Sequence, residues 1–186
     1  MADGFNRIFV LYPRGAQTGG PEALHQIVDA LRRQGHDASL VPLKSTAGLP
    51  RASAYERYDA PESELIDNPA NAVIVPEGML EHLPQVRRAQ RICWWLSIDN
   101  SAPFVPRQEA RDRRFTRPID APHANWSPNA ASYTSRRVVA RRPWRSLLES
   151  SRHLAQSAYA RAYLLSSLGV SAAVVSDYLP LERPAP

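Results

Sequence analysis

The chain has 186 residues and a formal net charge of +5, and 44% of its residues are hydrophobic. This length is typical of a single domain with a core of its own. The longest apolar runs, such as "IFVLY" and "AVIV", are far shorter than the roughly 20 residues of a membrane helix. One cysteine, Cys93, excludes an internal disulfide, and the start "MADGFNRIFV" lacks the pattern of a signal peptide. We therefore expect a cytoplasmic protein with one domain at 1–180 and a linker or frayed end at 181–186.

The first half of the chain has the pattern of alternating strands and helices. The run "RIFVLY" is continuously apolar, and the apolar residues from Leu24 to Leu31 recur at the spacing of a single buried helix face. Pro21 suits the first turn of that helix, and Gly35 suits the residue after it. In chain order we predict a strand at 7–12, a helix at about 21–34, a strand at about 38–43, a polar connection at 44–71, a strand at 71–77 and a short helix within 79–90 that has Pro84 near its start.

The second half continues the pattern around one unusual segment. "RICWWLSIDN" is a strong apolar run that ends in polar residues, and an insertion at about 101–152, rich in arginine and proline, is predicted to be irregular with one short helix. "HLAQS" predicts a fifth strand and "AAVVSDYLP" a sixth. Between them Ser157 and Gly169 suit the two ends of a helix from about Ala158 to Leu168. Continuous apolar strands alternating with helices indicate an α/β, Rossmann-like fold, with a mainly parallel sheet and helices on both faces.

Polar residues and glycines follow four of the predicted strands. They are "GAQTGGPE" after the first strand, "PEG" at 76–78, "SIDN" at 97–100 and "QS" at 156–157. Open parallel sheets bind their ligands at the carboxyl ends of the strands, where these segments would meet. The sequence therefore predicts a ligand site at this edge of the sheet.

The loop "YPRGAQTGGPEALHQ" has the layout of a phosphate-binding loop without matching the two commonest motifs. Pro21 stands where a P-loop needs its lysine, and the spacing of Gly15, Gly19 and Gly20 does not give G-x-G-x-x-G. Gly19 and Gly20 would still let a ligand approach closely, with the amides and the positive end of the helix facing a phosphate. The alternative is a tight turn in which Pro21 only starts the helix.

Three further residues at this edge are candidates for catalysis. Glu77 follows a strand and could bind a sugar hydroxyl, act as a base or cap the next helix. Asp99 and Asn100 end a central strand, where a carboxylate can accept the proton of an acceptor hydroxyl, and the alternative there is an Asx turn. His25, one residue after Leu24, is expected to be a partly exposed helix residue rather than a catalyst.

No metal site and no cofactor are expected. The single cysteine and the five scattered histidines do not have the spacing of metal ligands. A G-x-S-x-G nucleophile motif is absent from the sequence as well, which argues against a hydrolase of that fold.

Several segments resemble one enzyme family. "TGGPEALHQIVDALRRQGHDASLV" resembles the opening of glycosyltransferases with the GT-B fold, particularly retaining enzymes related to glycogen and sucrose synthases, in which a Gly-Gly-x-Glu loop begins the first helix. "AVIVPE", "RICWWLSIDN" and "HLAQSAYARAYLLSSLGV" are similar to later parts of a bacterial subgroup linked to surface-polysaccharide synthesis. The resemblance covers most of residues 7–179, except the arginine-rich insertion. It implies the N-terminal, acceptor-side domain of an enzyme that moves a sugar from a nucleotide-sugar donor to a polysaccharide or lipid-linked saccharide.

The resemblance also implies roles for individual residues. In the family, the two glycine amides approach the diphosphate of the donor, so that role falls by position on Gly19 and Gly20, with Asp99 and Asn100 near the acceptor. A second Rossmann-like domain supplies most nucleotide contacts, and this chain stops at Pro186, where that domain should begin. We therefore expect an N-terminal half, or a standalone protein that is inactive alone. The alternative is a non-catalytic Rossmann-like module that binds a saccharide, a nucleotide or a protein partner.

The positive charge is concentrated in the insertion. Residues 101–152 hold 11 arginines and four acidic residues, a net charge of +7, together with phenylalanine and tryptophan. Nucleic acid is not expected as a partner, because neither a basic recognition helix nor an RNA-binding aromatic motif is present. Arginine attracts anionic lipid headgroups and tryptophan settles at the interface, and the alternative is a solvated loop whose arginines pair with surface acids. We predict contact with the inner face of the membrane, or with the acceptor, through Arg136, Arg137, Arg141, Arg142 and Trp144.

Overall fold

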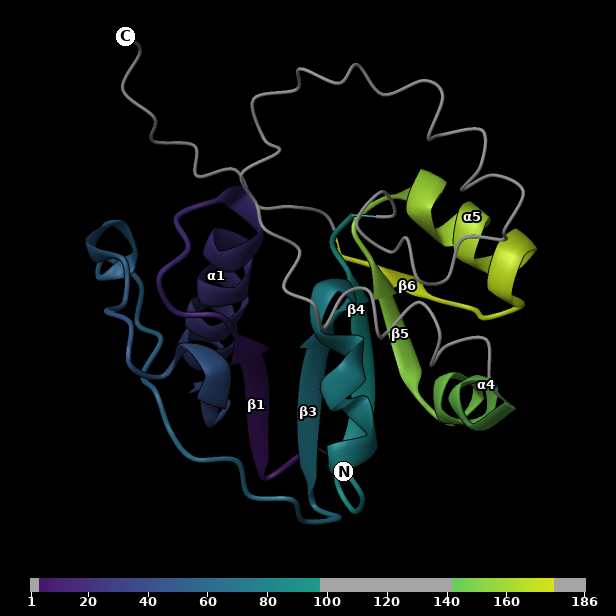
Figure 1. Cartoon of the computed structure of the whole chain (residues 1–186), viewed down its shortest axis with the longest axis horizontal. Coiled ribbons are helices and arrows are strands. Elements are labelled where there is room, and N and C mark those ends of the chain that lie inside the picture. Colours follow the sequence, from purple (N-terminus) through teal and green to yellow (C-terminus); the bar gives the residue numbers. More distant parts are fainter. Residues whose placement is uncertain (1–3, 98–141, 176–186) are drawn as a thin grey trace, which may run out of the picture.

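The computed structural model describes residues 4–97 and 142–175, which are built around one sheet (Figure 1). The six strands run parallel, in the spatial order β2-β1-β3-β4-β5-β6. This arrangement confirms the predicted α/β, Rossmann-like fold. The strands are β1 (Arg7–Tyr12), β2 (Ala38–Pro42), β3 (Asn71–Pro76), β4 (Gln90–Trp95), β5 (Arg152–Ala155) and β6 (Ala173–Val174).

The strand order reverses between β1 and β3. The chain moves from β1 outward to β2, and then returns to the other side of β1 to begin β3. Beyond β2, Leu40 forms a parallel bridge with Glu62, since the Leu40 amide donates to the Pro61 carbonyl (2.8 Å) and the Ser63 amide donates to the Leu40 carbonyl (2.9 Å). If this bridge is counted as a short strand and the strands are renumbered along the chain, the spatial order from the bridge to β5 becomes 3-2-1-4-5-6, which is the order of dinucleotide-binding folds. β6 is then an additional strand at the far edge.

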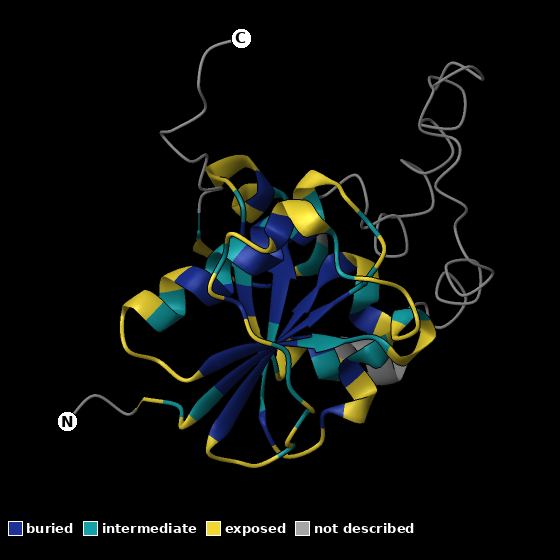
Figure 2. Cartoon of the chain, turned by 90° about the vertical axis from the view of Figure 1, so that its left-hand side faces the viewer, coloured by how far each residue is buried: buried dark blue, intermediate teal, exposed yellow. Residues whose placement is uncertain are grey.

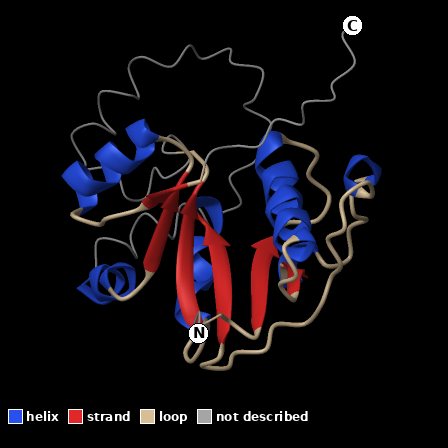
Figure 3. Ribbon diagram, turned by 180° about the vertical axis from the view of Figure 1, so that it is seen from behind, coloured by secondary structure: helices blue, strands red, loops and turns tan. Residues whose placement is uncertain are grey.

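Helical elements cover both faces of the sheet. They are α1 (Gly19–Arg33), α4 (Arg142–Glu149), α5 (Ala158–Leu168) and the 3-10 segments η1 (Lys44–Thr46), η2 (Ser53–Tyr55) and η3 (Glu77–Gln85). α1 packs on one face through Leu24 and Val28, whereas η3, α4 and α5 pack on the other. The 3-10 segment η3 lies in front of the sheet in Figure 1, and α1 lies in front in Figure 3, which is the view from behind.

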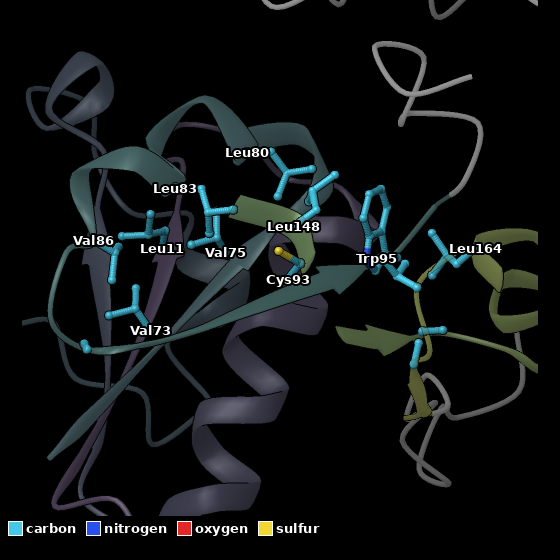
Figure 4. Close-up of a cluster of buried hydrophobic side chains, with 14 of the residues drawn as sticks. Leu11, Val73, Val75, Leu80, Leu83, Val86, Cys93, Trp95, Leu148 and Leu164 are labelled. Atoms are coloured by element: carbon cyan, nitrogen blue, oxygen red, sulfur yellow. The ribbon is translucent and has the colours of Figure 1, made fainter. Parts of the chain in front are cut away.

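Alternate side chains of the central strands enter two separate cores. In β1, Val10 and Tyr12 lie on the α1 side, whereas Phe9 and Leu11 lie on the side of η3. This is the period of two that a strand buried on both faces must have. Figure 4 shows the core on the η3 side, where Trp95 lies among side chains from η3, α4 and α5. Figure 2 shows the result, with buried strands inside and exposed residues on the outer sides of the helices.

The second predicted helix and the last two strands differ from expectation. η3 begins at Glu77, is a 3-10 segment instead of an α-helix, and has Pro84 near its end instead of near its start. Gly78 and Pro84 both disfavour an α-helix, and Met79 between them has non-helical angles (φ −129°, ψ 16°). β5 ends at Ala155, and β6 pairs with β5 through only two residues, so both strands are shorter than predicted.

Some predictions fall outside the described residues. These include the end of the fourth strand at 98–100, most of the insertion at 101–152 and the boundary at 180–181. α4 lies within the insertion and confirms its predicted short helix. The predicted ends of α5 are also confirmed, since the Ser157 hydroxyl accepts a hydrogen bond from the Ala160 amide (3.1 Å) and Gly169 is left-handed. Within the described ranges, no helix has the length and apolar character needed to cross a membrane.

Candidate functional site

The predicted site residues follow neighbouring strands at the carboxyl edge of the sheet. Gly19 and Gly20 come after β1, and Glu77 comes directly after β3, which pairs with β1 in parallel. The strand order reverses between these two strands, which is where open α/β sheets bind ligands. Asp99 and Asn100 lie outside the described residues, so their placement remains a prediction.

Gly19 and Gly20 are the first two residues of α1, which begins two residues earlier than predicted. Thr18 occupies the N-cap position, and its side chain makes no capping hydrogen bond. Both glycines have negative φ, and a Cβ built on either one would meet no atom within 4 Å. Neither backbone strain nor packing therefore explains glycine here, although an α-helix disfavours glycine by up to about 1 kcal/mol relative to alanine. Gly19 is exposed and Gly20 is half-buried, so the first turn of α1 is open to solvent.

The connection between β2 and β3 is packed along α1, although the sequence indicated only a polar connection. The Tyr55 hydroxyl donates to the Thr18 carbonyl (2.9 Å), and the Tyr58 hydroxyl donates to the Glu22 carboxylate (2.8 Å). Arg57 also contacts Glu22 (2.5 Å), so the acidic side chain in the first turn is partly neutralised. This segment therefore forms one wall beside the start of α1.

His25 is completely buried, so the prediction of a partly exposed residue was wrong. Its ring meets Tyr12 edge-on, with 5.2 Å between centroids, and packs at a tilt against Tyr55 at 4.6 Å. The sequence did hold a signal, because Pro21, His25 and Val28 have the i, i+4, i+7 spacing of a buried face. The sequence of α1 could not show that Tyr55, from the connection between β2 and β3, covers the ring.

The contacts of His25 define its tautomer. Nδ1 lies 2.7 Å from the Pro21 carbonyl and therefore carries the proton, whereas Nε2 is buried without a hydrogen-bond partner in the described part of the chain. Burial lowers the pKa of His25, and the nearby Arg51 guanidinium acts in the same direction. The Pro21 hydrogen bond and the Glu22 carboxylate oppose this change. His25 is thus neutral at pH 7.

Glu77 is buried and holds the segment that follows β4. Its two carboxylate oxygens accept hydrogen bonds from the amides of Leu96 (2.9 Å) and Ser97 (3.0 Å). Burial raises the pKa of Glu77 to about 7, although these amides act in the opposite direction. The side chain thus connects the ends of β3 and β4, a contact that the sequence did not indicate.

A cation at the end of β1 is already paired. The Arg14 guanidinium and the Tyr12 hydroxyl both bind the Glu62 carboxylate. Arg14 is further held by its amide, which donates to the Thr46 hydroxyl (3.1 Å), and by its guanidinium, which donates to the Ala47 carbonyl (2.7 Å). This network, which sequence reasoning missed, fixes the exit of β1 against the connection.

The residues predicted to contact a membrane or the acceptor are only partly described. Arg136, Arg137 and Arg141 lie outside the described residues, and Arg142 and Trp144 belong to α4. Contact through these side chains remains a prediction. In the part of the chain that the structure describes, no group of three or more histidine, cysteine or acidic residues could hold a metal ion.

Comparisons with known proteins do not assign a family. No protein-family model matches the sequence, and no curated protein matches it significantly. A functional proposal therefore depends on the fold and on the contacts at the carboxyl edge of the sheet.

Proposed function

We propose that the chain is the N-terminal, acceptor-side domain of a GT-B glycosyltransferase, in which the amides of Gly19 and Gly20 face the diphosphate of a nucleotide-sugar donor. The observation that carries this proposal is the open first turn of α1 beside the reversal of strand order. A helix start offers amide donors and a positive dipole end to an anion. Glycines without a packing role give a phosphate the closest approach to these amides.

The proposal assigns the acceptor to the end of β4. Asp99 would accept the proton of the acceptor hydroxyl, with Asn100 beside it. In this assignment Glu77 has a structural role and is not the base, because its carboxylate already accepts hydrogen bonds from the amides of Leu96 and Ser97. Glu77 would thus hold the start of the segment that presents Asp99.

Energetics limit what this domain does alone. The end of a helix contributes about 0.3–1 kcal/mol to anion binding when exposed, and up to about 2 kcal/mol when partly buried. Even a millimolar Kd requires about 4 kcal/mol. A donor-binding domain would supply the remaining contacts, so the chain by itself binds the donor weakly and transfers no sugar.

Binding can be tested by NMR titration of the whole chain with a panel of nucleotide sugars, the matching nucleosides and the free sugars. We expect an affinity no tighter than millimolar that depends on the diphosphate, with amide shift changes centred on Gly19 and Gly20. Micromolar affinity for a nucleotide sugar would contradict the proposal. Binding of a free saccharide, without any effect of the diphosphate, would favour a non-catalytic binding module.

A further inference from the structure

The two glycines at the start of α1 need restraint from elsewhere if they are to bind an anion well. Glycine loses more conformational freedom on ordering than any other residue, and Gly19 and Gly20 have no side chains through which neighbours could hold them. Binding sites gain affinity when their donors are held in the bound geometry beforehand. The restraint must therefore act on the backbone groups that flank the glycine pair.

The carbonyl before the pair is held twice. The Thr18 carbonyl accepts a hydrogen bond from the Glu22 amide (3.1 Å), which closes the first helical turn. It also accepts one from the Tyr55 hydroxyl (2.9 Å). Thr18 is exposed, so water could satisfy its carbonyl if Tyr55 were absent. The carbonyl therefore does not depend on this hydrogen bond, which pairs the hydroxyl of the buried Tyr55 side chain and orders the turn.

The carbonyl after the pair is held by the buried histidine. Nδ1 of His25 donates to the Pro21 carbonyl (2.7 Å), and the imidazole packs against the Tyr55 ring. The two rings therefore support each other while each holds one carbonyl that flanks Gly19 and Gly20. Tyr55 comes from the connection between β2 and β3, more than 30 positions away along the chain.

We infer that Tyr55 and His25 are positioning residues that clamp the Gly19–Gly20 turn in the geometry in which its amides receive a diphosphate. This inference rests on the proposed function for its ligand. The clamp itself is a property of the backbone and can be measured without any ligand. It makes the connection between β2 and β3 a part of the binding site.

The sharpest test removes one hydroxyl and leaves the ring. Tyr55→Phe keeps the packing on His25 and loses the hydrogen bond to Thr18, and Tyr159→Phe is the matched control because Tyr159 is an exposed tyrosine on α5. We expect ¹⁵N order parameters of Gly19 and Gly20 to fall from about 0.85 toward 0.6 in Tyr55→Phe. Exchange of the Glu22 amide should accelerate about fivefold, the effect of losing one net hydrogen bond. Tyr159→Phe should match the wild type in both measurements.

A second variant and a small anion complete the test. His25→Phe should mobilise the same turn, whereas His36→Phe, at an exposed position, should not. In a titration with inorganic pyrophosphate, Tyr55→Phe should raise the Kd about fivefold relative to the wild type. Unchanged order parameters and exchange in Tyr55→Phe would overturn the clamp. Absence of any pyrophosphate shift at Gly19 and Gly20 of the wild type would overturn the proposed function instead.

Discussion

The carboxylate of Glu77, directly after β3, accepts a hydrogen bond of 2.9 Å from the amide of Leu96, directly after β4. This contact joins the ends of two neighbouring strands at the edge where the ligand site is predicted. The carboxylate is buried, and desolvation outweighs its hydrogen bonds, so the pKa of Glu77 rises to about 7. Its charge therefore depends on pH within the physiological range.

The first prediction concerns the stability of the fold against pH. The folded state binds a proton at Glu77 more tightly than the unfolded state, so the contribution of Glu77 to stability is fully present below pH 4.5. It should fall as pH rises to about 7 and then stay constant. At about 1.4 kcal/mol per pKa unit, the loss amounts to roughly 3 kcal/mol.

Urea unfolding between pH 4.5 and 8 should show this fall in the wild type, and Glu77→Gln should lack it. Glu64→Gln, at an exposed carboxylate, is the control. Equal pH profiles of wild type and Glu77→Gln would refute the prediction.

The second prediction concerns His25 and has the opposite sign. Burial holds the pKa of His25 below its usual 6.5, so its contribution to stability is present above pH 6.5 and is lost as pH falls further. His25→Phe should lack this part of the pH dependence: the free energy of unfolding of the wild type minus that of the variant should rise with pH from 4.5 to 6.5, whereas Glu77 changes both proteins equally and in the opposite direction. Part of the dependence should remain, because burial also lowers the pKa of His153. A profile that only shifts, with the steepness of the wild type, would count against the buried neutral imidazole.

The third prediction separates ligand binding from folding at the glycine pair. A Cβ at position 20 meets no atom within 4 Å, so Gly20→Val should fold with a free energy within about 1 kcal/mol of the wild type. The added side chain should obstruct a diphosphate and weaken binding of nucleotide sugars at least tenfold, as read from NMR titration. Ala30→Val, an exposed position on the same helix, controls for β-branching and should leave binding unchanged. If Gly20→Val instead loses its fold, the glycines serve the turn rather than a ligand.

The fourth prediction concerns the arginine-rich insertion. Each arginine near an anionic membrane surface contributes about 1 kcal/mol, and salt screens it with a Debye length of about 8 Å at physiological ionic strength. Sedimentation with vesicles that contain anionic lipid should therefore remove the protein from solution at low salt and release it at high salt. Replacing Arg136, Arg137, Arg141 and Arg142 by glutamine should abolish the effect. The control replaces Arg107, Arg111, Arg113 and Arg114, which removes equal charge elsewhere in the insertion. Equal loss of binding in both variants would mean that net charge, rather than the segment at 136–142, holds the protein to lipid.

The sequence by itself determined the class of fold and most of its elements. Continuous apolar runs such as "IFVLY" have no polar face to offer to water, so both faces of these strands must be covered, and a parallel sheet with helices on each side achieves this. Local patterns likewise placed α1 and α5, because helix periodicity and end signals such as Ser157 and Gly169 act within a few residues. The weakest predictions were η3 and β6, where glycine, proline or a sheet edge makes the local signal ambiguous.

Only the tertiary structure decided which polar groups meet at the carboxyl edge. Glu77 binds amides 19 and 20 positions further along the chain, and Tyr55 reaches back 37 positions to Thr18. His25 is buried because the connection between β2 and β3 folds over it, and not because of its place on α1 alone. Such contacts depend on how segments distant in sequence pack together. A local sequence pattern does not predict that packing, because the same pattern leaves a side chain exposed or buried depending on which distant segment covers it.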